Sequence, residues 1–104
     1  MFKISDVIED TFEVELDIEF DDGSKKKIVL HIKPPKMKMY AKLQRIDQLR
    51  GKEFDDFALS VLNNNTDGQR ITMNEYGELT TAEISVLLIK YLDWLNSKIT
   101  ADPN

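Results

Sequence analysis

The sequence TFEVELDIEFDDGSKKKIVLHIK, residues 11–33, alternates apolar and polar side chains on both sides of a short turn segment. Its alternating apolar residues are Phe12, Val14, Leu16, Ile18 and Phe20 before the turn and Ile28, Leu30 and Ile32 after it. A period of two sustained over about ten residues is typical of a strand with one buried face. The intervening DDGS, residues 21–24, is rich in turn-forming residues. Residues 11–33 are therefore predicted to form a β-hairpin.

The register of this hairpin can be predicted from its turn. A three-residue loop of Asp21, Asp22 and Gly23, with the glycine in the left-handed region, suits a type I turn followed by a bulge. The resulting register pairs apolar residues with each other and acids with bases: Phe12–Ile32, Val14–Leu30, Leu16–Ile28, Glu13–His31, Asp17–Lys27 and Glu19–Lys25. A two-residue loop would instead place Asp17 opposite an isoleucine. Because turn chemistry and both sets of pairs agree, we expect the first register.

Three helices are predicted after the hairpin, at about residues 35–50, 53–63 and 80–99. Pro35 suits the first turn of the first helix, and Gly51 suits its C-terminal cap. The second helix has apolar residues at the helical spacing i, i+3, i+4, i+7 and i+8, namely Phe54, Phe57, Ala58, Val61 and Leu62.

The third predicted helix has the strongest local signals. Thr80 and Glu83 have the spacing of a capping box. The helix then carries a wide apolar stripe, made of Ile84, Leu87, Leu88, Tyr91, Leu92, Leu95 and Ile99 and widened by Val86, Ile89 and Trp94. A helix that is apolar over so much of its circumference is either central in the core or buried in a partner.

These elements predict one α+β domain over residues 1–104, an N-terminal antiparallel β-hairpin packed against three α-helices. A hairpin of two strands leaves strand edges unpaired, and this favours a protein-binding role through strand addition or helix packing. We expect the contact residues toward the end of the last helix, at Tyr91, Trp94, Leu95 and Ile99, because aromatic anchors dominate interfaces. The alternative is that all four belong to the core.

Composition narrows the class of protein. The chain has no cysteine, which excludes disulfides, thiolate nucleophiles and zinc–thiolate sites. No apolar run reaches the length of about 18 residues that a membrane span needs. The first ten residues, MFKISDVIED, are too charged for a signal peptide. We therefore expect a cytoplasmic protein that has no contact with a membrane.

Charge is segregated along the chain. Residues 1–24 hold nine acids and one base, residues 25–52 hold ten bases and one acid, and residues 53–104 hold nine acids and three bases. The basic block could follow a phosphate backbone. However, Lys25 and Lys27 face acids across the predicted hairpin, and the isoelectric point near 4.8 is far below that of nucleic-acid-binding domains. Direct nucleic-acid binding is not expected, and an acidic protein partner suits the block equally well.

Residues 63–74, NNNTDGQRITMN, partly match a calcium-binding loop. Asn63, Asn65, Asp67 and Gly68 fit the first half of the pattern, but position twelve is Asn74 where a bidentate glutamate is required. One carboxylate cannot offset the dehydration of a divalent cation. We therefore predict a helix–helix connection and no metal site.

No catalytic or cofactor-binding residues are predicted. The single histidine, His31, lies on the polar face of the second strand, where Glu13 supplies an acid but no serine is expected nearby. The carboxylates of the first strand are spaced by two and form a solvated face. The chain also lacks a glycine-rich phosphate loop.

The hairpin sequence of residues 11–33 and the ending LTTAEISVLLIKYLDWLNSKI, residues 79–99, resemble those of the tail assembly chaperones of long-tailed phages and prophages. The resemblance implies a non-enzymatic protein that binds tape-measure or tail-tube protein during tail assembly in the bacterial cytoplasm. Two alternatives remain open. One is an acidic inhibitor that mimics nucleic acid through the first strand and Asp55–Asp56, and the other is an enzyme subunit. Self-association of the chain is also open.

Overall fold

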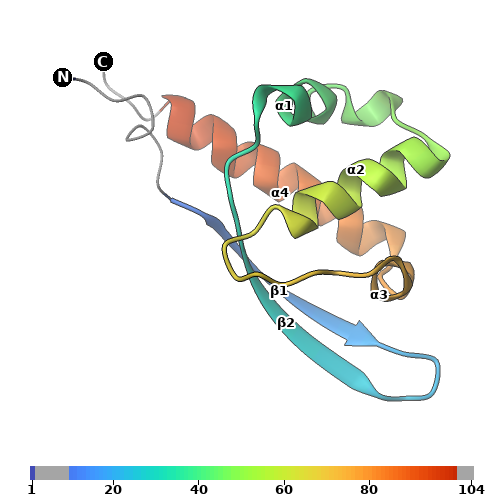
Figure 1. Ribbon diagram of the computed structural model, residues 1–104. Coiled ribbons are helices and arrows are strands. Elements are labelled where there is room, and N and C mark those ends of the chain that lie inside the picture. Colours follow the sequence, from blue (N-terminus) through green and yellow to red (C-terminus); the bar gives the residue numbers. More distant parts are fainter. Residues whose placement is uncertain (2–9, 101–104) are drawn as a thin grey trace.

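The computed structural model describes Met1 and residues 10–100 of the chain, with side chains as far as Lys98. Its elements follow one another as β1 (Phe12–Glu19), β2 (Lys25–Ile32), α1 (Met37–Leu43), a 3₁₀ helix η2 (Ile46–Gln48), α2 (Gly51–Asn63), α3 (Met73–Gly77) and α4 (Thr81–Thr100). The predicted α+β class, an N-terminal antiparallel hairpin followed by helices, is confirmed (Figure 1). The described residues form four α-helices where three were predicted.

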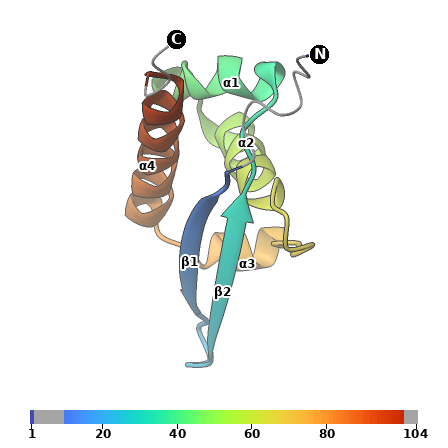
Figure 2. The same ribbon diagram turned by 90° about the vertical axis from the view of Figure 1, so that its left-hand side faces the viewer.

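The hairpin forms one layer, and helices cover one of its faces. Figure 2 shows α4 beside β1 and α2 beside β2. The apolar residues that alternate toward the helices are buried or half-buried, and those on the opposite face are mostly exposed. One core cluster results, made of Leu16, Ile18, Ile28, Leu30 and Ile32 from the hairpin, Phe57, Ala58, Val61 and Leu62 from α2, Ile84, Leu87, Leu88, Tyr91 and Leu95 from α4, and Leu43, Leu49, Ile71 and Tyr76 between them.

The predicted hairpin register is confirmed in every pair. Gly23 has a φ of 87°, in the left-handed region that the bulged turn requires. Of the three predicted acid–base pairs, only Glu13–His31 forms an ion pair between facing residues in the described part of the chain. Among the described residues the Lys27 ammonium lies 3.7 Å from the carboxylate of Glu15, and it forms no ion pair with Asp17 directly opposite. The register therefore depends on the turn and the apolar face more than on facing charges.

The predicted helix over residues 35–50 is wrong in its extent. The chain leaves helical geometry at Arg45 (φ −111°, ψ 27°), between α1 and η2. In a continuous helix Leu43 and Leu49, six residues apart, would point about 120° away from each other. The break lets both of these leucines enter the core.

Gly51 begins α2 instead of capping the preceding helix. Its φ of 57° lets the chain turn directly from η2 into α2, which therefore starts two residues before the predicted boundary. The end of η2 is capped by Arg50, whose guanidinium Nη1 donates to the carbonyl oxygens of Asp47 and Leu49. The guanidinium of Arg50 therefore supplies the C-terminal capping that the sequence predicts for Gly51.

The short helix α3 was not predicted, and it closes the core near the turn end of the hairpin. Its capping box joins Thr72 to Glu75, with the Glu75 amide 3.1 Å from Thr72 Oγ1 and the Thr72 amide 3.0 Å from Glu75 Oε1. The other carboxylate oxygen of Glu75 lies 2.6 Å from the Lys26 ammonium. Lys26 is opposite Ile18 on the apolar face, so this ion pair closes the edge of the core.

Candidate functional site

The outer edge of β1 has unpaired backbone groups. The amide of Phe20 bonds to Ser24 across the hairpin, so even-numbered residues of β1 pair with β2 and odd-numbered ones point their N–H and C=O groups away. The outward-facing set is Glu13, Glu15, Asp17 and Glu19. Within residues 10–100 no group bonds to these outward N–H and C=O groups. Such a row is a template for another strand.

The outer edge of β2 is partly closed by a loop of the same chain, residues 64–67. The Lys33 amide donates to the carbonyl oxygen of Asn64 at 2.7 Å, and the Thr66 amide donates to that of His31 at 3.0 Å. The His31 amide donates to the Asp67 carboxylate at 2.6 Å. Of the two spare edges that the hairpin predicts, β1 therefore offers the longer free one.

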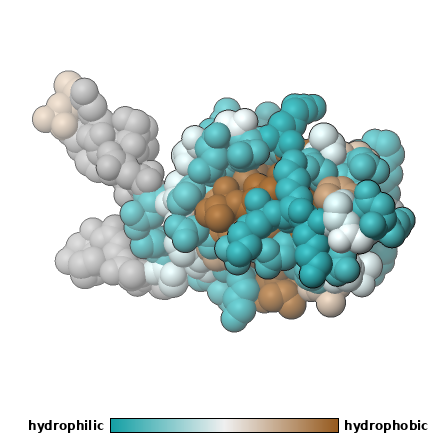
Figure 3. All heavy atoms as spheres, turned by 90° about the horizontal axis from the view of Figure 1, so that it is seen from below, coloured by the Kyte–Doolittle hydropathy of each residue, from teal (hydrophilic) through white to brown (hydrophobic). Residues whose placement is uncertain are grey.

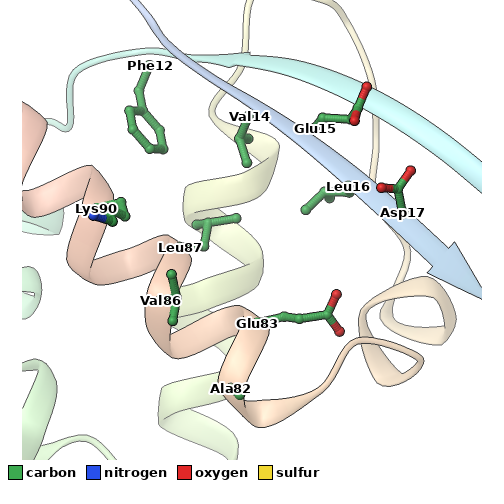
Figure 4. Close-up of a pocket in the computed structure, with 10 residues that line it drawn as sticks. All are labelled: Phe12, Val14, Glu15, Leu16, Asp17, Ala82, Glu83, Val86, Leu87 and Lys90. Atoms are coloured by element: carbon green, nitrogen blue, oxygen red, sulfur yellow. The ribbon is translucent and has the colours of Figure 1, made fainter.

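A groove of about 460 Å³ runs along this free edge, between β1 and α4 (Figure 4). Its lining comes from alternate sides of β1 and from one side of α4: Phe12, Val14, Glu15, Leu16, Asp17, Ala82, Glu83, Val86, Leu87 and Lys90. In Figure 4 Val14, Leu16 and Leu87 point into the space between strand and helix. Figure 3 shows a hydrophobic patch surrounded by mostly hydrophilic surface on one face of the molecule. The groove combines apolar walls with unpaired backbone groups.

Among the side chains of α4 that the structure describes, the large apolar ones that are exposed lie in the first half of the helix. Val86 is 54% exposed and Ile89 is 55% exposed. Val86 lines the groove, whereas Ile89 does not. These two similar residues therefore provide a matched pair for experiments.

The contact residues expected from the sequence lie elsewhere. Tyr91 and Leu95 are core residues, and the Tyr91 hydroxyl donates to the carbonyl oxygen of Lys33 at 2.6 Å. Burial raises the pKa of Tyr91 above its usual range. Trp94 is half-buried, with its ring stacked 5.9 Å from that of Tyr91, and the side chain of Ile99 lies outside the described residues. For Tyr91 and Leu95 the core alternative holds, so in this fold they offer no surface to a partner.

Toward the turn of the hairpin the groove continues into an acidic depression of about 420 Å³. Its lining is almost entirely polar: Asp17, Glu19, Phe20, Asp21, Glu78, Thr80 and Glu83. Glu83 is held there by the predicted capping box, with its carboxylate 2.9 Å from the Thr80 amide. Within the described part of the chain no three acidic or histidine side chains converge to hold a metal ion. The depression therefore presents a spread of negative charge to a neighbour.

His31 is held between two carboxylates on the polar face. Its Nε2 lies 3.0 Å from Glu13, as the register predicts, and its Nδ1 lies 2.9 Å from Asp67. The hydrogen bond that His31 makes to Asp67 is the largest cause of a raised pKa of His31, and the charge of Asp67 and the contact with Glu13 add to it. The contacts with His31 lower the pKa of Asp67. An imidazole with acceptors at both nitrogens is stabilised as a cation and is poorly suited to act as a general base.

The calcium-like segment uses its polar side chains to hold the loop. The Asn63 side chain bonds to both the amide and the carbonyl of Ile71. Asn65 Oδ1 accepts from the amides of Asp67 and Gln69. With Asp67 bound to His31, the three side chains that resemble ligands each have a structural role in joining α2 to α3.

Comparisons of this chain with protein-family models, with curated proteins and with solved structures found no match. Among the described residues no helix has both the length and the apolar character to cross a membrane.

Proposed function

We propose that this chain is a non-enzymatic protein-binding module that takes an extended segment of a partner onto the free edge of β1. The observation that carries the proposal is the juxtaposition of unpaired backbone groups with an apolar groove. In strand addition the main-chain hydrogen bonds supply affinity, and pockets for alternate side chains supply specificity. Both requirements are met along residues 12–17.

The resemblance to tail assembly chaperones suggests the class of partner. A chaperone of this kind works in the bacterial cytoplasm and shelters a tape-measure or tail-tube protein until the tail assembles. Segments of such a partner that are extended and apolar before assembly would be protected by the groove. The role requires no turnover, in agreement with an imidazole that is committed to two carboxylates.

Co-expression with the tape-measure protein of a long-tailed phage tests the proposal. The wild-type chain should increase the soluble fraction of that protein and co-purify with it. Val86→Asn should lose both effects, since it removes an apolar groove wall, and Ile89→Asn should retain them. The proposal fails if the tape-measure protein is equally insoluble with and without the chain and no complex can be isolated.

The alternative function, an acidic inhibitor that mimics nucleic acid, is tested by a different measurement. Its carboxylate row on β1 lies directly beside Lys25 and Lys27 of β2 on the same exposed face, so the negative charge there is interrupted. Salt-sensitive inhibition of a nucleic-acid enzyme by the purified chain would favour this alternative over the chaperone role.

A further inference from the structure

We infer that the segment bound at β1 is an extended strand in which apolar residues alternate with lysine or arginine, and that it belongs to another protein. The inference rests on the proposed strand-binding role and adds the chemistry of the ligand. The inferred composition follows from the side chains of this protein that would surround a strand paired with β1.

An added strand would place its side chains alternately on the two faces of the sheet. On the helix side they would lie beside Val14 and Leu16 and against Val86, where apolar side chains fit. On the other side they would lie beside the outward-facing acids of β1, and opposite charges across neighbouring strands are stabilising. The two sides of the edge therefore require alternating apolar and basic residues.

The acids of β1 can accept new basic partners, although Glu13 already contacts His31 and Glu15 contacts Lys27. The Glu13 side chain is 70% exposed, and that of Glu15 is 52% exposed. In the described residues Asp17 and Glu19 form no ion pair, although Lys27 and Lys25 face them from β2. A strand on the opposite side of β1 would bring cations to carboxylates that β2 leaves without close ion pairs.

The acidic depression predicts that the two ends of the bound segment differ in composition. It begins where the apolar groove ends and shares Asp17 and Glu83 with it. The end of the segment that lies near the hairpin turn should therefore carry bases on the helix side as well. The end near Phe12 should be apolar on that side.

A second copy of this chain is a poor occupant. Pairing β1 with β1 of another copy would place carboxylates beside carboxylates, and like charges across strands are destabilising. The β2 edge of another copy carries lysines, but it is free only from Lys25 to Val29 because residues 64–67 cover the rest. The apolar residues on its helix-facing side, Ile28, Leu30 and Ile32, are already buried in its own core and cannot fill the groove. The complementary partner is therefore a different protein.

Two synthetic peptides of ten residues test the inference, with identical alternating apolar residues and either lysine or glutamate between them. Binding is followed by NMR on the ¹⁵N-labelled protein. At low salt the lysine peptide should bind about tenfold more tightly than the glutamate peptide, with the difference reduced at about 1 M salt. Amide exchange should slow at Glu13, Glu15 and Asp17, whose N–H groups point outward.

Variants separate the two parts of the inference. Val86→Asn should weaken binding of the lysine peptide about tenfold and Ile89→Asn should leave it unchanged. Asp17→Lys should reduce the preference for lysine. Equal affinities for the two peptides, protection of β2 amides instead of β1 amides, or no binding up to millimolar concentration would each overturn the inference. Rescue of the tape-measure protein by the wild-type chain but not by Val86→Asn, alongside equal affinities or no peptide binding, would leave the proposed function standing; protection of β2 amides would count against both.

Discussion

At the scale of single residues, His31 joins three parts of the chain: β1 through Glu13, β2 through its own backbone, and the loop after α2 through Asp67. Its pKa is raised above the ordinary value of 6.5, so its contribution to stability is fully present below that value. The contribution is lost as pH rises through the raised pKa. The pKa of Asp67 is lowered, and its contribution is lost only in strong acid.

We therefore predict that the melting temperature of the wild-type protein falls as pH rises from about 6 to 9, by more than that of His31→Gln. Asp67→Asn should flatten the profile more than Glu13→Gln does, because the hydrogen bond with Asp67 is the largest cause of the shift. Thermal melts monitored by circular dichroism measure this. Parallel profiles for wild type and His31→Gln would contradict it.

Substitutions of Glu75 separate its capping of α3 from its ion pair with Lys26. Its side chain is only 11% exposed, and it both caps α3 and pairs with Lys26. Glu75→Gln keeps the capping geometry and loses the ion pair, whereas Glu75→Ala loses both.

Chemical denaturation should show a larger loss of unfolding free energy for Glu75→Ala than for Glu75→Gln, with the cap alone worth about 0.5–2 kcal/mol. Lys26→Met, which removes the cation but leaves Glu75, serves as the third variant. Equal losses in the alanine and glutamine variants would mean that the cap contributes nothing.

At the scale of elements, the hairpin could be predicted from sequence because independent signals agree. The period of two, the DDG turn and the apolar pairing all specify one register. The break at Arg45 could not be read in the same way, since helix propensity is continuous from Met37 to Leu49 and only tertiary burial of Leu43 and Leu49 interrupts it. For α3 a signal was present: Thr72 and Glu75 have the same spacing as Thr80 and Glu83.

The glycine of the hairpin turn, Gly23, and a glycine of α3, Gly77, should respond in opposite ways to substitution by alanine. Gly23 has a positive φ, which costs an alanine about 1–2 kcal/mol, whereas Gly77 lies in α3 without a positive φ and with open space around its Cα. Gly23→Ala should destabilise the protein by about that amount. Gly77→Ala should stabilise it by about 0.4–1 kcal/mol through the unfolded chain. Denaturant midpoints measure both, and a stabilised Gly23→Ala variant would contradict the turn geometry.

At the scale of the whole molecule, the candidate site was predictable only in part. The free strand edge and its acids follow from the hairpin pattern, and the sequence identifies α4 as unusually apolar. Which part of α4 remains exposed depends on how the helix crosses the hairpin. The aromatic end, with Tyr91 and Trp94, packs against Phe12, and Val86 and Ile89 are left outside. Aromatic content alone does not show which side chains of α4 stay exposed, because that depends on packing against the hairpin.

The acidic face of β1 also predicts that copies of this chain do not pair through their β1 edges. Edge strands are protected from pairing with copies of themselves by charge, and four carboxylates alternate along this one. Glu13→Gln, Glu15→Gln and Asp17→Asn together should remove the repulsion while keeping side-chain size. The triple variant should then form a concentration-dependent dimer that the wild-type chain does not form at the same concentration. Sedimentation equilibrium measures the masses, and Asp47→Asn, Asp56→Asn and Asp93→Asn, which neutralise three acids away from β1, make the charge-matched control. If the control associates as strongly as the β1 variant, net charge and not the strand edge keeps the copies apart.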